Sequence, residues 1–236
     1  MSKPILVYYH TYLVGNFKLL IHEQLLKLFS SGLYGACKNV YIGISSPDNN
    51  NTNWVLDLIK DYDKIVPLVY EENHAEKSTL RYLMDIATKG DYYFYYYMTK
   101  NVATNTGVKS NITHEQIVKN ELWRVHMEYN TINKWKECVS YLDEGYDAVG
   151  CNFRKDTHVG SHPHFSGNFW WSKSDHINSL NHTYLYDEQM LGGANALLAE
   201  FWIGSNYEAN LKEVFDCGTV APYIKETTFK EYINPL

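Results

Sequence analysis

The feature that most constrains the fold is a regular alternation of short apolar runs and helical patterns over the first hundred residues. Four such runs, rich in β-branched and aromatic side chains as buried strands are, occupy residues 4–9, 39–45, 64–70 and 92–98. Between them, apolar residues recur at helical spacing. This order favours an open, mainly parallel sheet with helices on both faces. The predicted fold class is therefore α/β, a Rossmann-like sheet in a single domain.

Capping and breaking residues place the remaining elements. Asn16 is a suitable N-cap for the first helix, which the residues Ser30-Ser31-Gly32 would end. Pro67 indicates that its strand lies at an edge of the sheet or contains a bulge. Helices are expected over residues 17–28, 54–60, 78–88, 115–142 and 191–202, and a further strand over 146–152. Residues 164–171 are expected to lead into a last central strand. The tail beyond residue 202 is expected to be irregular.

Charge and composition exclude some classes of partner. The net charge is −6 and no basic run occurs, which argues against a nucleic-acid partner, because phosphate neutralisation needs clustered Lys and Arg. The 21 tyrosines and six tryptophans suit a surface that grips carbohydrate or nucleobase, although a compositional bias explains them equally well.

The N-terminus and the cysteines bear on location. The first apolar stretch, residues 4–14, is broken by His10 and is too short to span a bilayer, so no transmembrane segment is predicted. The four cysteines lack CxxC spacing and no signal peptide is recognised. We therefore expect reduced thiols in a cytoplasmic protein.

In sheets of this kind, ligands bind at the carboxyl ends of the strands. The residues expected there are Tyr9-His10, Ser45-Ser46, Tyr70-Glu71 and Thr99-Lys100. A second candidate is the string HFSGNFWW at residues 164–171. Gly167 lets the backbone approach a ligand closely, and Asn168 can donate and accept hydrogen bonds together, as the recognition of sugar hydroxyls requires. The indole of Trp170 could pack on a pyranose, but a plain core strand would have the same composition.

The string HFSGNFWW closely resembles a motif of GT-A glycosyltransferase domains that are encoded by large DNA viruses and by bacterial polysaccharide-synthesis clusters. Those domains also have a His-Thr-Lys-Gly strand end, which residues 98–101 partly match, and a Trp-Arg helix, matched by Trp123-Arg124. Residues 146–150 are similar to one of their strands, and the resemblance extends from the first strand to about Trp202.

The resemblance implies a GT-A fold and transfer of a sugar from a nucleotide-sugar donor to a glycan or glycoprotein acceptor. The enzyme would be a hexosyl- or deoxyhexosyl-transferase of glycan or polysaccharide biosynthesis. Residues 1–236 would form one domain, with a nucleotide-binding half over residues 1–110 and a sugar and acceptor half over residues 111–236.

The strand ending at residues 97–100 departs from the GT-A pattern. Family members place an Asp-x-Asp motif there, whose carboxylates hold a divalent cation against the donor diphosphate. Here the strand ends Tyr97-Met98-Thr99-Lys100 and the carboxylates are missing. The ammonium of Lys100 could supply the positive charge instead, so we expect weak dependence on Mn²⁺ or Mg²⁺, or none. The alternative is that Lys100 is a solvated residue at a strand end.

The resemblance also indicates a catalytic base. In GT-A enzymes an acidic residue near the acceptor loop deprotonates the acceptor in the inverting reaction, and Glu200 is the candidate here. Asp147 is the second candidate, although an Asp within a strand more often ties down backbone amides. Asp187 and Glu188 are further candidates in a loop.

Two other groups of residues are assigned to the donor. Tyr9 and His10 lie where GT-A folds receive the nucleotide base, and Tyr9 would either stack on that base or pack in the core. His164 would bind the donor or backbone by hydrogen bonds, with a lone metal-ligand role as the alternative. His158, His162 and His164 do not have the pattern of a structural zinc site, and no metal ligand is assigned.

Two competing functions follow from the same residues. The missing Asp-x-Asp would suit a non-catalytic carbohydrate- or nucleotide-binding domain of the same fold. A nucleotidyltransferase is disfavoured, because the chain shows neither acidic metal ligands at strand ends nor a glycine-rich phosphate loop.

Overall fold

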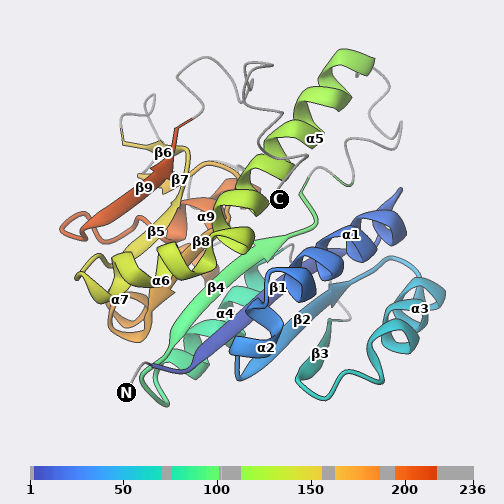
Figure 1. The fold of residues 1–236 in the computed structure, drawn as a ribbon, viewed down its shortest axis with the longest axis horizontal. Coiled ribbons are helices and arrows are strands. Elements are labelled where there is room, and N and C mark those ends of the chain that lie inside the picture. Colours follow the sequence, from blue (N-terminus) through green and yellow to red (C-terminus); the bar gives the residue numbers. More distant parts are fainter. Residues whose placement is uncertain are drawn as a thin grey trace.

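The structure is a computed structural model that describes residues 3–70, 76–100, 102, 113–155, 163–186 and 195–216. The first half alternates strands and helices (Figure 1): β1 (Ile5–Tyr12), α1 (Phe17–Ser30), α2 (Leu33–Ala36), β2 (Asn39–Ser45), α3 (Asn49–Ile59), β3 (Ile65–Tyr70), α4 (Lys77–Ala87) and β4 (Tyr93–Met98). The second half contains α5 (His114–Glu128), the π-helix η1 (Tyr129–Asn133), α6 (Trp135–Asp143), β5 (Ala148–Cys151), β6 (Phe153–Arg154), β7 (His164–Phe165), β8 (Trp170–Lys173), α7 (Ser174–Ser179), α8 (Thr183–Tyr186), α9 (Asn195–Trp202) and β9 (Leu211–Phe215).

The central sheet has seven strands in the order β3-β2-β1-β4-β8-β5-β9. The strands β1 to β4 are parallel, β8 runs antiparallel to both β4 and β5, and β9 is parallel to β5. This order confirms the predicted open, mainly parallel sheet. It also places Pro67 in the edge strand β3, where a missing N–H donor is tolerated.

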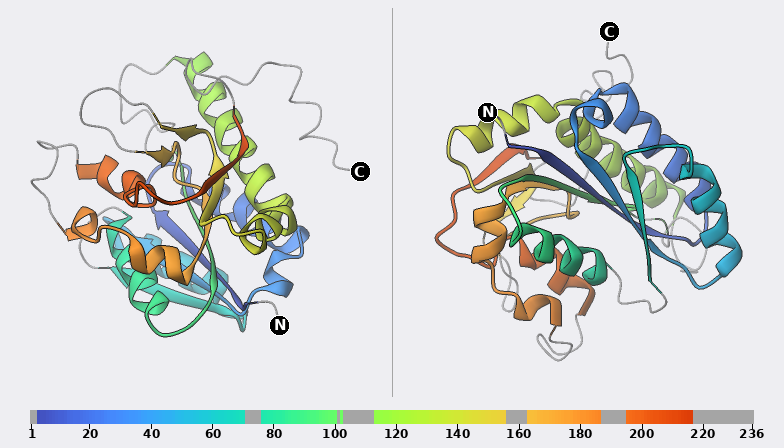
Figure 2. Two further views of the ribbon diagram at one scale, coloured as in Figure 1. Left: turned by 90° about the vertical axis from the view of Figure 1, so that its left-hand side faces the viewer. Right: turned by 90° about the horizontal axis from the view of Figure 1, so that it is seen from below.

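Helices cover both faces of the sheet (Figure 2). The core on one face is formed by alternate strand residues such as Tyr9, Tyr95 and Trp171 against α1, α3, η1 and α6. The core on the other face is formed by residues such as Tyr96 and Trp170 against α4, α7, α8 and α9. Strand residues alternate between the two faces, and both faces of the central strands β1 and β4 are buried, so these strands are apolar almost throughout.

The prediction of a single long helix over residues 115–142 is wrong. The structure has α5, the π-helix η1 and α6 in its place. The break follows from two polar side chains inside the helix: Asn130 Nδ2 donates to the His126 carbonyl at 3.0 Å, and Thr131 Oγ1 donates to the Met127 carbonyl at 2.7 Å. Such side chains compete with the backbone ladder and disturb a helix locally.

Other boundaries also differ from the expectation. Asn16 makes no capping hydrogen bond through its side chain, whereas Asp48 accepts from the Asn50 N–H at 2.8 Å and starts α3 five residues early. Residues 164–171, expected to lead into a last central strand, form the short strand β7 and a turn before β8 begins at Trp170. The tail expected to be irregular contributes β9 to the sheet. Several positions named above lie outside the described residues, namely Glu71, Asn101, His158, His162, Asp187, Glu188 and residues 217–236.

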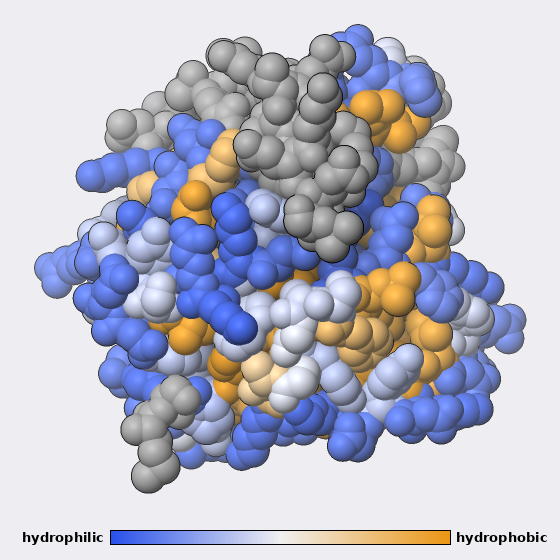
Figure 3. Space-filling model, viewed as in Figure 1, coloured by the Kyte–Doolittle hydropathy of each residue, from blue (hydrophilic) through white to orange (hydrophobic). Residues whose placement is uncertain are grey.

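No helix within the described ranges is long and apolar enough to cross a membrane. The face drawn in Figure 3 is largely hydrophilic, with hydrophobic surface on the side where α1 lies. Two leucines of α1, Leu19 and Leu26, are 59% and 66% exposed. Exposure of single apolar side chains is usual in globular proteins and does not by itself identify a partner.

Candidate functional site

The carboxyl ends of β1 and β4 lie side by side and carry His10, Thr99 and Lys100. The Thr99 N–H donates to the His10 carbonyl at 3.0 Å, and its Oγ1 accepts from the Tyr12 N–H at 2.9 Å. The His10 ring is buried, with Nδ1 2.9 Å from Thr79 Oγ1, and burial lowers its pKa to about 4. His10 is therefore neutral at pH 7. Its ring contacts Thr79, and its carbonyl accepts from Thr99 at the end of β4.

Lys100 forms an ion pair with Glu200. The Lys100 Nζ lies 3.7 Å from Glu200 Oε2, and the two side chains are 17% and 12% exposed. The same ammonium lies 5.0 Å from the centre of the Trp123 ring, a cation–π arrangement. Lys100 is thus held between α9 and α5 at the end of β4, instead of being solvated.

The turn between β7 and β8 packs against Glu200. The Gly167 N–H donates to Glu200 Oε1 at 2.6 Å, and His164 Nε2 lies 4.0 Å from the same oxygen. Gly167 has a φ of +101° and Asn168 a φ of +60°, both in the left-handed region. Such a conformation in a residue other than glycine costs on the order of 1–3 kcal/mol and is frequent at functional sites. Lys100, His164 and the strained turn therefore converge on one carboxylate.

Glu76, to which the sequence assigned no role, completes this cluster. It immediately precedes α4 and is only 7% exposed. Its Oε2 accepts from Asn168 Nδ2 at 2.6 Å and from the Tyr96 hydroxyl at 2.7 Å. The Asn168 Oδ1 accepts in turn from Trp170 Nε1 at 2.6 Å. The sequence contained one signal for Glu76: it is an acidic residue between a predicted strand and the next helix, on the side of the sheet where ligands bind.

The environment of Glu76 favours the protonated form of its carboxyl group. Burial raises its pKa from 4.5 to about 7, and the nearby charge of Glu200 adds to the increase. The hydrogen bonds from Tyr96 and Asn168 act in the opposite direction. The positive charge of Lys100 also lowers the pKa. The result is a carboxyl group that exchanges its proton near neutral pH, as general acids and bases do.

Glu76 should make the stability of the protein depend on pH. Because its pKa is about 7 in the folded state and about 4.5 in the unfolded chain, the folded state binds the extra proton between these values. As pH rises through this window, the wild type loses stability that Glu76→Gln does not lose. The difference in unfolding free energy should shift by about 2–3 kcal/mol in favour of the variant, since one pKa unit corresponds to about 1.4 kcal/mol. Urea denaturation of both proteins from pH 4.5 to 8 measures this shift, and parallel curves would contradict it.

Two residues assigned to the donor are enclosed in the core. The Tyr9 side chain is 0% exposed, stacks on Tyr97 with ring centres 4.3 Å apart, and donates to Gln24 Oε1 at 2.5 Å. Trp170 is also 0% exposed and stacks on Tyr96 with ring centres 5.2 Å apart. Both rings therefore pack in the core, which was the alternative left open for them from the sequence. Neither ring presents a free face to a ligand.

Asp147 lies at the opposite edge of the sheet from Lys100. It precedes β5, which runs in the same direction as β4, so it is at the amino end of its strand. Its carboxylate accepts from the Asn210 N–H at 2.8 Å and lies 3.0 Å from Lys173 Nζ. Burial opposes its charge, but these two partners outweigh burial and hold its pKa below the ordinary value. These contacts tie the strands and the following loop together.

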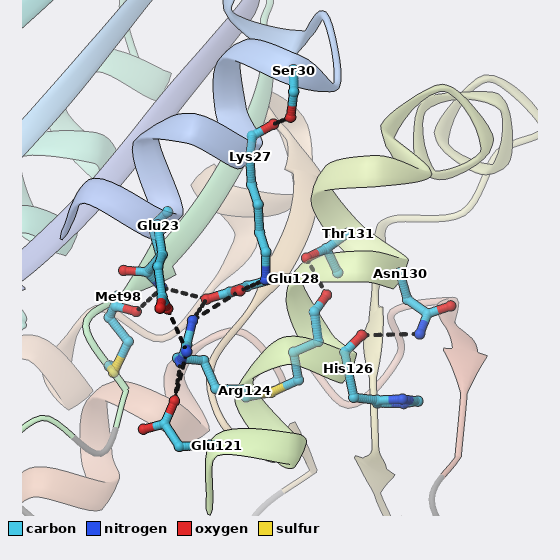
Figure 4. A network of polar contacts seen from close by, with 12 residues as sticks. Glu23, Lys27, Ser30, Met98, Glu121, Arg124, His126, Glu128, Asn130 and Thr131 are labelled. Atoms are coloured by element: carbon cyan, nitrogen blue, oxygen red, sulfur yellow. Dashed lines mark hydrogen bonds and ion pairs between the residues drawn. The ribbon is translucent and has the colours of Figure 1, made fainter. Parts of the chain in front are cut away.

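A buried ionic network joins α1 and α5 beside the cluster (Figure 4). The Glu128 side chain is 0% exposed and accepts from Arg124 at 2.8 and 3.1 Å, from Gln24 at 2.8 Å, and from Lys27. Burial opposes the charge of Glu128, but Arg124 and Lys27 outweigh burial and keep its pKa below the ordinary value. Gln24 Nε2 also donates to the Met98 carbonyl at 3.0 Å, so the network reaches the end of β4.

Sequence patterns did not reveal this network. Arg124 makes further ion pairs with Glu23 at 2.9 Å and with Glu121 at 2.6 Å, and its side chain is only 4% exposed. The adjacent residue, Trp123, provides the ring that makes the cation–π contact with Lys100. The i, i+4 spacing of Arg124 and Glu128 was the available signal, but that spacing is common on exposed helix surfaces.

No group of three or more His, Cys, Asp or Glu side chains within the described ranges is arranged to hold a metal ion. The Glu76–Glu200–Lys100 cluster contributes two carboxyl groups and one ammonium, together with the amide of Asn168. Such a set of groups can offset negative charge, hold hydroxyl groups and exchange a proton.

No family model and no curated protein matches this sequence. Among solved structures, a 4-diphosphocytidyl-2C-methyl-D-erythritol synthase from Anaerococcus prevotii has a TM-score of 0.49 and 14% identity, covering 98% of this chain and 94% of that chain. A proposed nucleotide-diphospho-sugar transferase from Desulfovibrio desulfuricans has a TM-score of 0.44 and 8% identity, covering 92% and 81%. With TM-scores below 0.5, these similarities do not identify the chemistry of this chain.

Proposed function

We propose that this protein transfers a hexose or deoxyhexose from a nucleotide diphosphate-sugar to a hydroxyl group of a glycan or glycoprotein, with inversion at the anomeric carbon. The observation that carries the proposal is the partly buried Lys100 at the carboxyl end of β4, flanked by two carboxyl groups and by the strained turn at Gly167 and Asn168. The resemblance of HFSGNFWW to glycosyltransferase motifs supports the same function, because that string forms this turn.

In the proposed reaction, the ammonium of Lys100 offsets the charge that develops on the leaving diphosphate. Thr99 and His164 lie beside it and would contact the donor. Asn168 is 0% exposed and its amide is engaged by Glu76 and Trp170, so it would position the Glu76 carboxyl group instead of contacting the sugar. A carboxyl group of the cluster, Glu200 or Glu76, would take the proton of the acceptor hydroxyl.

The test is a thermal-shift screen with UDP-, GDP-, dTDP- and CMP-sugars, each with Mn²⁺ and with EDTA. A ligand that binds only the folded state raises Tm according to its concentration relative to Kd. We expect one nucleotide class to raise Tm, and the EDTA arm measures whether a metal ion contributes. No increase with any donor would contradict a nucleotide-sugar site. Binding without transfer or hydrolysis would instead support a binding domain.

Lys100→Ala should weaken binding of the nucleotide sugar found in that screen. A hydrogen-bonded charged contact contributes about 1.5–3 kcal/mol, so Kd should rise by about 10- to 150-fold. Lys173→Ala is the matched control, because Lys173 is equally exposed at 17% and also pairs with a carboxylate, but at the opposite edge of the sheet. Isothermal titration calorimetry measures both. Equal Kd values for the two variants would exclude the diphosphate role of Lys100.

A further inference from the structure

Two carboxyl groups flank Lys100, and their surroundings differ. Both oxygens of Glu200 are engaged: Oε1 accepts from the Gly167 N–H at 2.6 Å, and Oε2 lies 3.7 Å from Lys100 Nζ. A proton on either oxygen would weaken one of these contacts. Glu200 therefore holds the turn and the ammonium in place, and its charge is part of that arrangement.

Glu76 is held through one oxygen only. Its Oε2 accepts from both Tyr96 and Asn168, whereas Oε1 accepts no hydrogen bond from the described residues. The two donors come from β4 and from the turn before β8, and the rigid sheet supports both. The carboxyl group is thus fixed in orientation and still has one oxygen that can receive a proton.

The charged and titratable groups around Glu76 favour proton exchange near neutral pH. Tyr96 faces it from β4, Lys100 from the residues after β4, and Glu200 from α9. Burial dominates over these groups and raises the pKa of Glu76 to about 7. A base with a pKa near the working pH is the most effective in proton transfer.

We propose that Glu76, and not Glu200, is the catalytic base of the site and takes the acceptor proton on Oε1; this inference rests on the function proposed above. The acceptor oxygen forms a bond to the anomeric carbon, and the bond from that carbon to the diphosphate oxygen breaks. The electron pair of the broken bond leaves with the diphosphate, beside Lys100. The acceptor proton passes to Glu76 Oε1 and afterwards to water.

The experiment compares wild type with Glu76→Gln, Glu200→Gln and Glu213→Gln. Glu213 is a matched control: it is partly buried in β9, its pKa is also raised, and it accepts from the Phe153 N–H outside the cluster. The probes are UDP-glucose, UDP-galactose, GDP-mannose, GDP-fucose and dTDP-rhamnose, with water and a mixture of free monosaccharides as acceptors. Nucleoside diphosphate release gives kcat and kcat/KM from pH 5 to 9, and calorimetry gives the donor Kd.

Glu76→Gln should lower kcat by at least about 100-fold, the usual contribution of a general base, while its donor Kd stays within about twofold of wild type. The decrease of wild-type kcat/KM below about pH 7 should disappear in this variant. Glu200→Gln should change the donor Kd and keep that decrease, and Glu213→Gln should behave as wild type.

Four results would overturn the assignment. Full turnover by Glu76→Gln would show that the base lies elsewhere. A raised donor Kd with unchanged kcat would make Glu76 a donor contact, and loss of the acidic limb in Glu200→Gln would return the role to Glu200. The assignment of a catalytic base would also be overturned if the wild type binds a probe but releases no nucleoside diphosphate from it with either acceptor. If no probe binds at all, it is the proposed function itself that fails, which separates the two ideas.

Discussion

Arg124→Ala is expected to lower the free energy of unfolding by about 3–5 kcal/mol, the cost of removing one partner from a buried ion pair. The substitution leaves the fully buried Glu128 carboxylate with Lys27 as its one remaining cation among the described residues. It also removes the Arg124 contact of Glu23 and of Glu121, which are 43% and 33% exposed and lie within reach of solvent. Urea or guanidinium denaturation, followed by circular dichroism, measures the loss.

Two controls separate the buried charge from other effects. Lys89→Ala breaks the ion pair between Lys89 and Asp85, two side chains that are each 57% exposed. This variant should lose less than about 1 kcal/mol of unfolding free energy. The double variant Arg124→Met/Glu128→Leu removes both charges and should regain most of the lost stability, because apolar pairs can replace buried ion pairs. If Arg124→Ala costs no more than Lys89→Ala, the network does not stabilise the contact between α1 and α5.

Gly167→Ala should lower the free energy of unfolding by about 2–6 kcal/mol and weaken donor binding as well. At a φ of +101° any other residue is strained, which costs on the order of 1–3 kcal/mol. A Cβ at this position would lie 2.3 Å from Met127 Sδ and 3.1 Å from the Trp123 ring, so the buried α5 contact must shift. Overpacking of this kind costs about 1–3 kcal/mol more. Because the Gly167 N–H holds Glu200, the displacement should reach Lys100.

Gly145→Ala is the control for backbone strain. Gly145 has nearly the same φ, +107°, but a Cβ there would meet no atom within 4 Å. Its cost should be limited to strain of about 1–3 kcal/mol, with donor binding unchanged. Denaturation and calorimetry on both variants separate the two contributions. Equal losses of stability and unchanged donor binding in both would show that the packing of Gly167 on α5 is unimportant.

Much of the fold could be predicted because the information is local. The strands at residues 39–45 and 92–98 are short apolar runs, and a strand–helix–strand order with buried strands leaves few arrangements other than an open parallel sheet. The break within residues 115–142 was missed because Asn130 and Thr131 bond to carbonyls of the preceding turn, an effect that apolar spacing does not show. The strand β9 was missed because it is half-buried at the edge and has no apolar run.

The candidate site was predicted in part. Lys100, His164, Asn168 and Glu200 are separated by up to a hundred residues in the chain, and the fold brings them together at one edge of the sheet. Their roles in binding and catalysis stay predictions. Tyr9 and Trp170 are aromatic residues of the kind that stack on ligands. Because side chains alternate between the two faces of a strand, both point into the buried core.

The sequence by itself determined the class of fold, the strand ends and the unusual turn string, because these depend on periodicity, residue size and conformational preference. Only the tertiary structure decided which carboxyl groups meet Lys100. It also decided that Glu76 is buried between Tyr96 and Asn168 and that Arg124 and Glu128 form a buried pair. The pKa of Glu76 and the charge of that pair depend on burial and on partners distant in the chain. Burial and distant partners exist only once the sheet and its helices have packed.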